Sequence, residues 1–320
     1  MTGKSTHRIG RRAFLKGAAA VAAGSALGAS FRADAESVFP PGRYVDIHTH
    51  LGQRWGFREI LTVEKLLKWM DENDIAQAAV LPLISPEAWD HPLSTDYVLR
   101  ETEPHRDRLF PFCSIDPRTL LLGGYAKKRD LLLKYKEAGA KGFGEHKPGV
   151  AIDDPRNIEL FQASAEVGLP ILFHLDNDRN MDQPGLPGLE KVLKEVPNGI
   201  FIGHANGFWA SISGGITQAD LSAYPKTPVQ PGGALDRLMD AYPNLYGDLS
   251  AGSGSNAIER DLAFGREFIV RRADRLLFGT DYLAPAQQVM QLALYRTLDL
   301  PEAVQAKVFR DNARRLLGLL

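Results

Sequence analysis

Cysteine is nearly absent from this sequence. Cys113 stands alone among 320 residues, which excludes a disulfide within the chain. Folding therefore does not need an oxidising compartment. Because Cys113 lies in the apolar run 109–115, we expect a buried core thiol rather than a nucleophile.

An excess of charge of either sign is also missing, since 38 Lys and Arg face 39 Asp and Glu, for a formal net charge of −1. Without a dense basic stretch, nucleic acid is not expected as the main partner. Beyond residue 35 no apolar run reaches the roughly 20 residues of a membrane span, so we expect no stable span in the mature protein. The composition, 44% hydrophobic and 24% charged, is typical of a globular chain that forms one α/β barrel or two smaller domains.

Residues 1–35 have the features of an export signal. The twin arginines Arg11 and Arg12 lie in a segment, 10–16, that resembles a twin-arginine (Tat) signal, and an alanine- and glycine-rich stretch follows over 17–30. Ala33-Asp34-Ala35 supplies a cleavage site of the A-x-A type. We therefore expect a signal peptide over 1–35 that the Tat export machinery recognises, and one periplasmic or otherwise extracytoplasmic domain over 36–320. An uncleaved anchor is the alternative.

The rest of the chain alternates apolar runs typical of buried strands with amphipathic segments typical of helices. We expect a first strand that ends at Gly52, and further strands over 76–83, 109–115, 140–144, 170–173, 199–203, 245–249 and 275–278. Regular alternation of strand and helix implies a parallel sheet, and eight such units fit a closed (β/α)₈ TIM barrel. An open doubly wound sheet is less favoured, because no glycine-rich phosphate loop follows the first strand.

Metal-binding and acid–base residues recur at the carboxyl ends of these expected strands, where active sites of barrels lie. His48 and His50 share one face of the first strand, roughly 6–7 Å apart along it. Neutral imidazole is a common ligand of zinc and similar ions. The full set of candidates is His48, His50, Glu145, His174, His204 and Asp281.

Four motifs carry a resemblance to the amidohydrolase superfamily, particularly its amidohydrolase-related branch, over residues 44–317. They are Asp46-Ile47-His48-Thr49-His50, Phe173-His174, Ile202-Gly203-His204 and Phe278-Gly279-Thr280-Asp281, and Asp311-Asn312-Ala313 resembles that branch's ending. The resemblance implies a metal-dependent barrel enzyme in which His48, His50, His174 and Asp281 hold a divalent ion. The histidine pair of the first strand favours zinc for that ion. The resemblance also implies that His204 holds or polarises the water or the substrate.

The fourth strand departs from the pattern of the binuclear members that use a carboxylated lysine. Lys141 starts that strand and Lys147 lies beyond it, so neither is well placed for that role. Glu145 stands at the strand end instead and resembles the bridging glutamate of TatD-like hydrolases, which allows a second ion. The alternatives are a carboxylate that hydrogen-bonds to a ligand, or a salt bridge to Lys147.

Other residues give weaker indications. His91 and His105 are expected at the surface, and alternation turns His146 away from Glu145. Arg54 and Trp55 either line the pocket or pack on the surface, and the weaker pocket candidates are Asn206, Trp209 and Asp248. The glycine- and proline-rich insert 205–233 is a candidate substrate-covering loop.

These features favour an exported hydrolase that acts on an amide, ester or lactone bond of a small molecule with metal-activated water. In that interpretation Asp281 takes the proton from the water and His204 polarises the carbonyl. One alternative is a non-oxidative decarboxylase of an unsaturated or aromatic carboxylic acid. A second is a non-catalytic exported metal-binding barrel, which the presence of both proton-transfer groups, His204 and Asp281, argues against.

The signal makes one prediction about export. Changing Arg11 and Arg12 together to Lys should leave the folded protein in the cytoplasm, because an export receptor reads the arginine pair. Cell fractionation measures this, with Arg8→Lys as the matched control outside the pair. Unchanged export of the double variant would indicate another route.

Overall fold

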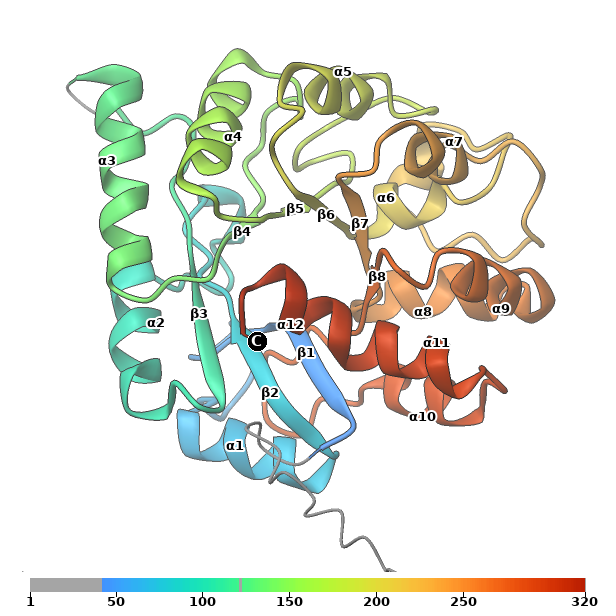
Figure 1. Ribbon diagram of the computed structural model, residues 1–320, viewed down its shortest axis with the longest axis horizontal. Helices are drawn as coiled ribbons and strands as arrows, with labels where there is room; N and C mark the ends of the chain where they lie inside the picture. Colours follow the sequence, from blue (N-terminus) through green and yellow to red (C-terminus); the bar gives the residue numbers. More distant parts are fainter. Residues whose placement is uncertain (1–41, 121–122, 320) are drawn as a thin grey trace, which may run out of the picture. The chain divides into compact units, whose positions relative to one another are not determined.

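A computed structural model of the protein describes residues 42–120 and 123–319, and these form a ring of eight parallel strands (Figure 1). Each strand pairs with the next one along the chain, from β1 to β8. The strands are β1 Tyr44–Thr49, β2 Ile75–Val80, β3 Leu109–Cys113, β4 Gly142–His146, β5 Ile171–His174, β6 Phe201–His204, β7 Leu245–Asp248 and β8 Leu276–Leu277. The predicted TIM barrel is confirmed.

Backbone hydrogen bonds close the ring between the first strand and the segment that follows the last one. Ile47 N donates to Phe278 O at 3.0 Å, and Asp281 N donates to His48 O at 2.8 Å. A parallel bridge also joins Thr49 to Tyr282. Because of this closure, residues near 280 lie beside the carboxyl end of β1.

Helices follow the strands and surround the ring (Figure 1). The α-helices are α1 Val63–Glu72, α2 Thr95–Thr102, α3 Gly124–Glu137, α4 Pro155–Val167, α5 Pro187–Glu195, α6 Asn206–Ala210, α7 Ala234–Ala241, α8 Ala251–Glu259, α9 Leu262–Arg271, α10 Met290–Thr297, α11 Glu302–Ala306 and α12 Asn312–Leu316. Shorter helical turns are η1 Pro86–Ala88, η2 Glu103–His105, η3 Ala219–Ser222 and η4 Lys307–Asp311. Two starts follow local rules, since Thr62 caps α1 and Asp154 caps α4, where Pro155 takes the first position.

Hydrophobic side chains fill the barrel in two layers. The inner layer contains Val45, Ile47, Ala79, Leu81, Phe110, Phe112, Leu172, Ile202 and Leu277, together with Ala313 and Leu317 at the end of the chain. Arg314 of α12 donates to Gln77 near the start of β2, which places α12 at the amino-terminal end of the barrel. The carboxyl end is therefore the end available for a site.

Cys113 is buried in the outer layer, as expected, and burial raises the pKa of its thiol.

Two strands contain an extra residue at the point where site residues begin. From Asp46 to Thr49, β1 advances three residues while β2 advances two, from Ala78 to Val80. β4 shows the same irregularity between Phe143 and His146. One extra residue turns the following side chains to the other face of a sheet. Strict alternation from Ile47, which points into the barrel, would turn His48 outward, so this bulge is what directs His48 to the barrel mouth.

The insert 205–233 is only partly a loop, because it contains α6 and η3. It is attached to the loop that follows β5. Gln218 donates to the side-chain oxygen of Asn177 at 2.8 Å, and Asn177 donates back to Gln218 O at 2.8 Å. The insert thus lies at the same end of the barrel as the strand ends.

The expected signal peptide, 1–35, and the start of the expected domain at 36 lie outside the described residues. Within the described part of the chain, no helix combines the length and the apolar character needed to cross a bilayer.

Asn312 anchors the last helical segment to the barrel. Its buried amide donates to Ala273 O at 2.6 Å and Leu276 O at 3.0 Å, which ties the last helical segment to β8. Asn312→Ala should lower the free energy of unfolding by roughly 2–3 kcal/mol, because two buried carbonyls lose their donor. Urea unfolding measures this. The control Asn244→Ala removes a similar bond to Gly199 O at a half-exposed position, and equal losses in the two variants would contradict the account.

Candidate metal centre

The six predicted site residues meet at the carboxyl end of the barrel. His48 and His50 come from β1, Glu145 from β4, His174 from β5 and His204 from β6, and Asp281 follows β8. The side chains of His48, His50, Glu145 and His204 are buried, whereas those of His174 and Asp281 are 14% and 21% exposed. The cluster therefore opens to solvent at His174 and Asp281.

The first group of candidate ligands is His48, His50 and Asp281. The two Nε2 atoms lie 3.2 Å apart, and Asp281 Oδ1 lies 3.6 Å from His48 Nε2 and 3.4 Å from His50 Nε2. Ligands placed about 2.0–2.2 Å from a shared ion at tetrahedral angles are roughly 3.3–3.6 Å apart. The spacing of this group fits one divalent ion.

The second group is Glu145, His174 and His204. Glu145 Oε1 lies 2.8 Å from His174 Nδ1 and 3.9 Å from His204 Nε2. The other oxygen, Oε2, faces the first group, at 3.6 Å from His50 Nε2 and 3.8 Å from His48 Nε2. Glu145 thus lies between the two groups, and the structure places His174 with Glu145 and His204, whereas the resemblance implied a single set with His48, His50 and Asp281.

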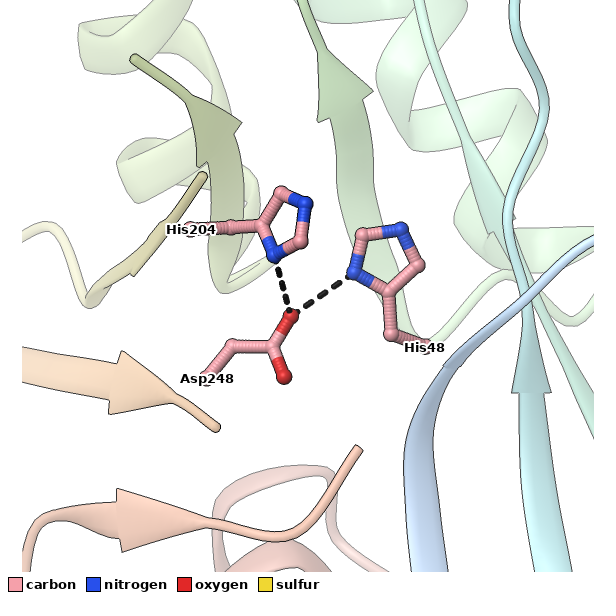
Figure 2. A group of neighbouring side chains, drawn as sticks. All are labelled: His48, His204 and Asp248. Carbon is pink, nitrogen blue, oxygen red and sulfur yellow. Dashed lines mark hydrogen bonds and ion pairs between the residues drawn. The ribbon is translucent and has the colours of Figure 1, made fainter. Parts of the chain in front are cut away.

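Each of the four imidazoles has an outer hydrogen bond that leaves its other nitrogen facing the cluster. The acceptors are Asp248 for His48 (2.7 Å), Leu81 O for His50 (2.8 Å) and Asp176 for His174 (2.8 Å), and Ser250 Oγ (2.9 Å) and Asp248 (3.2 Å) lie beside His204 Nδ1. Figure 2 shows one oxygen of Asp248 between the Nδ1 atoms of His48 and His204, while the other ring nitrogens point away from it. In a neutral ring, an N–H donated outward leaves a lone pair directed inward, which is the arrangement of metal-ligating histidine. His174 differs from the other three, because its inner Nδ1 lies at hydrogen-bond distance from Glu145 Oε1, 2.8 Å away, so an ion bound there would replace that hydrogen bond.

The charges of the cluster also favour a cation. Burial raises the pKa of Glu145, but Lys147 and His174 outweigh it and hold that pKa well below its usual value. His48 and His204 likewise lower the pKa of Asp248 to about 2 despite burial. Burial lowers the pKa of His48, but Asp281 and Asp248 raise it well above the usual value, so a bound ion would take the place of the second ring proton between Nε2 and the carboxylates. The carboxylates thus stay ionised, which is the state in which they can bind a divalent ion. Spacing, lone pairs and charge all fit a metal.

Three residues that complete the cluster were missed or underrated from the sequence. Asp248 was a weak pocket candidate, yet it holds two imidazoles, and neither Asp176 nor Ser250 was singled out. Asp176 follows His174 by two residues and Asp248 ends an expected strand, so position at a strand end was the available signal. Their partners are side chains far away in the sequence, which the local pattern does not identify.

Asp46 supports the cluster from below. Its carboxylate accepts from the backbone N of His48 and of Thr280, both at 3.0 Å, and from Thr280 Oγ1 at 2.5 Å. Burial raises its pKa to about 7. Asp46 therefore links β1 to the segment that delivers Asp281.

The predicted surface position of His91 is wrong, because its side chain is 3% exposed. The loop after β2 folds back through an antiparallel bridge between Leu83 and Leu93, and His91 Nε2 donates to Leu51 O at 2.8 Å. His105 is partly exposed in η2. His146 faces away from the cluster, as predicted, with its Nε2 at 2.8 Å from Asn157 Oδ1.

The remaining pocket candidates separate into two sets. Arg54 and Trp55 line a cavity of about 670 Å³ between the loops after β1 and β2, and Arg54 pairs with Asp90 at 3.1 Å. Trp209 is buried behind Asp248 and donates Nε1–H to its carbonyl at 2.8 Å, so it supports the site from outside. Asn206 donates to Ala223 O at 3.3 Å within the insert.

The family of the chain follows from a match to the amidohydrolase family model over residues 45–319, and the chain belongs to that family. No curated protein matches the sequence.

Solved structures resemble the barrel at low sequence identity. An uncharacterised TIM-barrel protein from Bordetella bronchiseptica is 15% identical, with 86% of this chain and 98% of that chain covered and a TM-score of 0.61. A probable 2-pyrone-4,6-dicarboxylic acid hydrolase from Acinetobacter baumannii, solved with citric acid, is 13% identical over 86% and 99%, with a TM-score of 0.57. A dihydroxybenzoic acid decarboxylase from a Polaromonas species, solved with manganese and 2-nitroresorcinol, is 16% identical over 86% and 97%, with a TM-score of 0.54. At these identities the likeness concerns the fold.

Elemental analysis tests the two ligand groups. The wild-type protein should hold two divalent ions per chain, and His50→Ala and His174→Ala should each lose about one, because each variant removes a donor from a different group. His105→Ala, which lies outside the cluster, is the matched control and should keep both. Full metal content in both cluster variants would contradict the assignment.

Proposed function

We propose that the protein is a metal-dependent hydrolase that uses two divalent ions, zinc above all, to hydrolyse an amide, ester or lactone bond of a small molecule. The observation that carries this proposal is the position of Glu145, with one oxygen toward His48 and His50 and the other toward His174 and His204. A carboxylate between two ligand groups is suited to a two-metal site, the arrangement used by many hydrolytic enzymes. Imidazole nitrogens and carboxylate oxygens suit zinc, although manganese fits the same donors.

When bound, divalent ions supply Lewis acidity and make water a nucleophile near neutral pH. Asp281 is the most exposed carboxylate of the cluster. Partial burial raises the pKa of its carboxyl group, but His48 and His50 outweigh this effect and hold that pKa below the usual range. Its carboxylate is therefore ionised and placed at the open side of the cluster, where it accepts the proton of the attacking water.

His204 has the geometry to polarise the carbonyl of the substrate. Its Nδ1 is held by Ser250 and Asp248, so Nε2 faces the cluster. Burial and the charge of His48 lower the pKa of His204, which keeps the ring neutral. Ser250 Oγ–H donates to Asp248, so Nδ1 of His204 donates outward and Nε2 would act as a metal ligand. Donation from Nε2 to the carbonyl would require Ser250 to turn its one hydroxyl proton to Nδ1 instead.

Decarboxylation is the second candidate reaction, because solved structures that share this fold include a manganese-containing decarboxylase. The position of Glu145 between the two ligand groups favours hydrolysis, since decarboxylation does not need a second ion to activate water. The product separates the two reactions: incorporation of ¹⁸O from labelled water supports hydrolysis, and release of CO₂ without water uptake supports decarboxylation.

We also propose that the enzyme acts outside the cytoplasm, on the basis of the twin arginines at 11 and 12. A non-catalytic metal-binding barrel is the remaining alternative. It would hold metal but turn over no member of a broad panel of esters, lactones, amides and carboxylic acids.

Asp281→Asn separates proton transfer from metal binding. The amide retains an oxygen that can coordinate but accepts no proton at neutral pH, so the variant should keep a substantial part of its metal and lose roughly 10²–10⁴-fold in kcat. The measurement is kcat on the best substrate of the panel, together with metal content. Asp220→Asn, which changes a partly exposed carboxylate of the insert, is the control. A metal-loaded and nearly fully active Asp281→Asn enzyme would mean that another group takes the proton.

A further inference from the structure

Two cationic side chains, Lys147 and Arg179, lie at the open side of the metal centre, where they pair with its carboxylates but contact none of the proposed metal-binding nitrogens. Lys147 Nζ lies 3.1 Å from Glu145 Oε2, and Arg179 Nη1 lies 3.0 Å from Asp176, the carboxylate that holds His174. Both are partly exposed, at 17% and 29%. They therefore flank the Glu145–His174 pair where solvent reaches it.

Contacts with one loop place the two cations on the same part of the rim. Arg179 Nη2 reaches Glu87 O at 3.4 Å, and Gly149, two residues after Lys147, packs against the Glu87 side chain so closely that a Cβ has no room. Glu87 belongs to the loop after β2, so the Arg179 side chain extends from the loop after β5 toward the β2 loop.

Not all N–H donors of the Arg179 guanidinium have a close hydrogen-bond acceptor among the described residues. Its Nε–H is buried and has no hydrogen-bond partner in the part of the chain that the structure describes, and the contact to Glu87 O is long. The Nε atom is covered by protein atoms, so a bound group would meet Arg179 through its Nη atoms at the partly exposed end of the side chain. Arg118, which is also 29% exposed, differs: its guanidinium pairs with both oxygens of Glu87 and both of Asp116 at 2.7–2.9 Å.

The charge of the loaded centre adds to this argument. Two bound divalent ions would match the negative charges of Glu145, Asp176, Asp248 and Asp281, so Lys147 and Arg179, which pair with two of these carboxylates, would then add positive charge at the open side. A cation that is partly buried near other cations attracts an anion strongly, because solvent screens it poorly.

From these contacts and charges we infer that the substrate carries a carboxylate group, separate from the bond that is cleaved, and that Lys147 and Arg179 bind it. The planar guanidinium and the ammonium provide N–H donors that match carboxylate oxygens. This inference rests on the proposed two-metal hydrolase and names its substrate class: acidic esters, lactones or amides in preference to neutral ones.

The test compares dicarboxylates with monocarboxylates on the metal-loaded full chain. One carboxylate of either probe can bind the ions, and the dicarboxylate offers a second one to Lys147 and Arg179. Calorimetry gives the affinity of malonate, succinate, glutarate and adipate, each relative to the monocarboxylate one carbon shorter. For at least one chain length the wild-type protein should favour the dicarboxylate by roughly 10- to 100-fold, the range for hydrogen bonds to charged groups.

Arg179→Met and Lys147→Met should each reduce this ratio about tenfold or more, whereas Arg118→Met should leave it unchanged. Arg179→Gln provides a second variant if Arg179→Met fails to fold. A wild-type ratio near one at every length, or a ratio that survives in both variants, overturns the inference.

Metal content, measured on the same samples, distinguishes this failure from failure of the proposed function. A chain that holds its ions and shows no selectivity overturns the inference alone. A chain without ions but with selectivity supports the anion site and overturns the two-metal centre, and a chain with neither overturns both.

Discussion

The outer hydrogen bonds of the four imidazoles are the interactions on which the rest of the site depends. Asp248, Asp176 and the carbonyl of Leu81 accept from His48, His174 and His50, and these bonds decide which nitrogen of each ring faces the cluster. A free imidazole can turn or change tautomer, so without an outer acceptor the inner lone pairs would not converge. Asp248 contributes most to this orientation, because one of its oxygens lies beside the Nδ1 atoms of both His48 and His204 (Figure 2). Its own position is fixed by Ser250 N–H and Oγ–H, and the indole of Trp209 holds its backbone carbonyl.

The barrel makes this polar cluster tolerable by separating it from the apolar interior. Below the cluster, Ile47, Leu172 and Ile202 fill the ring, and α12 covers the amino-terminal end. Buried charges are costly unless they are paired, and here each carboxylate lies beside a histidine or a cation. The bulges in β1 and β4 belong to the same arrangement, since they turn His48 and Glu145 toward the mouth without removing Ile47 from the interior. Asp46 then links β1 to the segment of Asp281 through Thr280.

Local sequence patterns sufficed for the barrel and for the six residues at its strand ends, because strand periodicity and the chain order of strands and helices are local properties. The orientation of His146 also followed from alternation. What local patterns do not contain is long-range pairing: Asp248 lies 200 residues from His48, and nothing around it distinguishes it from an ordinary strand-end aspartate. The sequence does not reveal the bulges either. It therefore predicted that His48 faces the site but not the bulge that turns it there. His91 was misplaced because a backward fold of the β2 loop buries it, and the sequence offers only a proline neighbour there. The contact between His174 and Glu145 likewise depends on where β4 and β5 end relative to each other. A local sequence pattern does not fix those ends.

The most direct test of the two-metal centre is anomalous X-ray diffraction from crystals of the zinc- or manganese-loaded protein, recorded on both sides of the metal absorption edge. The account predicts two peaks roughly 3.5–4 Å apart. One should lie among His48 Nε2, His50 Nε2 and Asp281, the other beside His174 Nδ1 and His204 Nε2, with the Glu145 carboxylate between them. A single peak that contacts neither Glu145 nor His174, or no peak within bonding distance of His48 and His50, would contradict it.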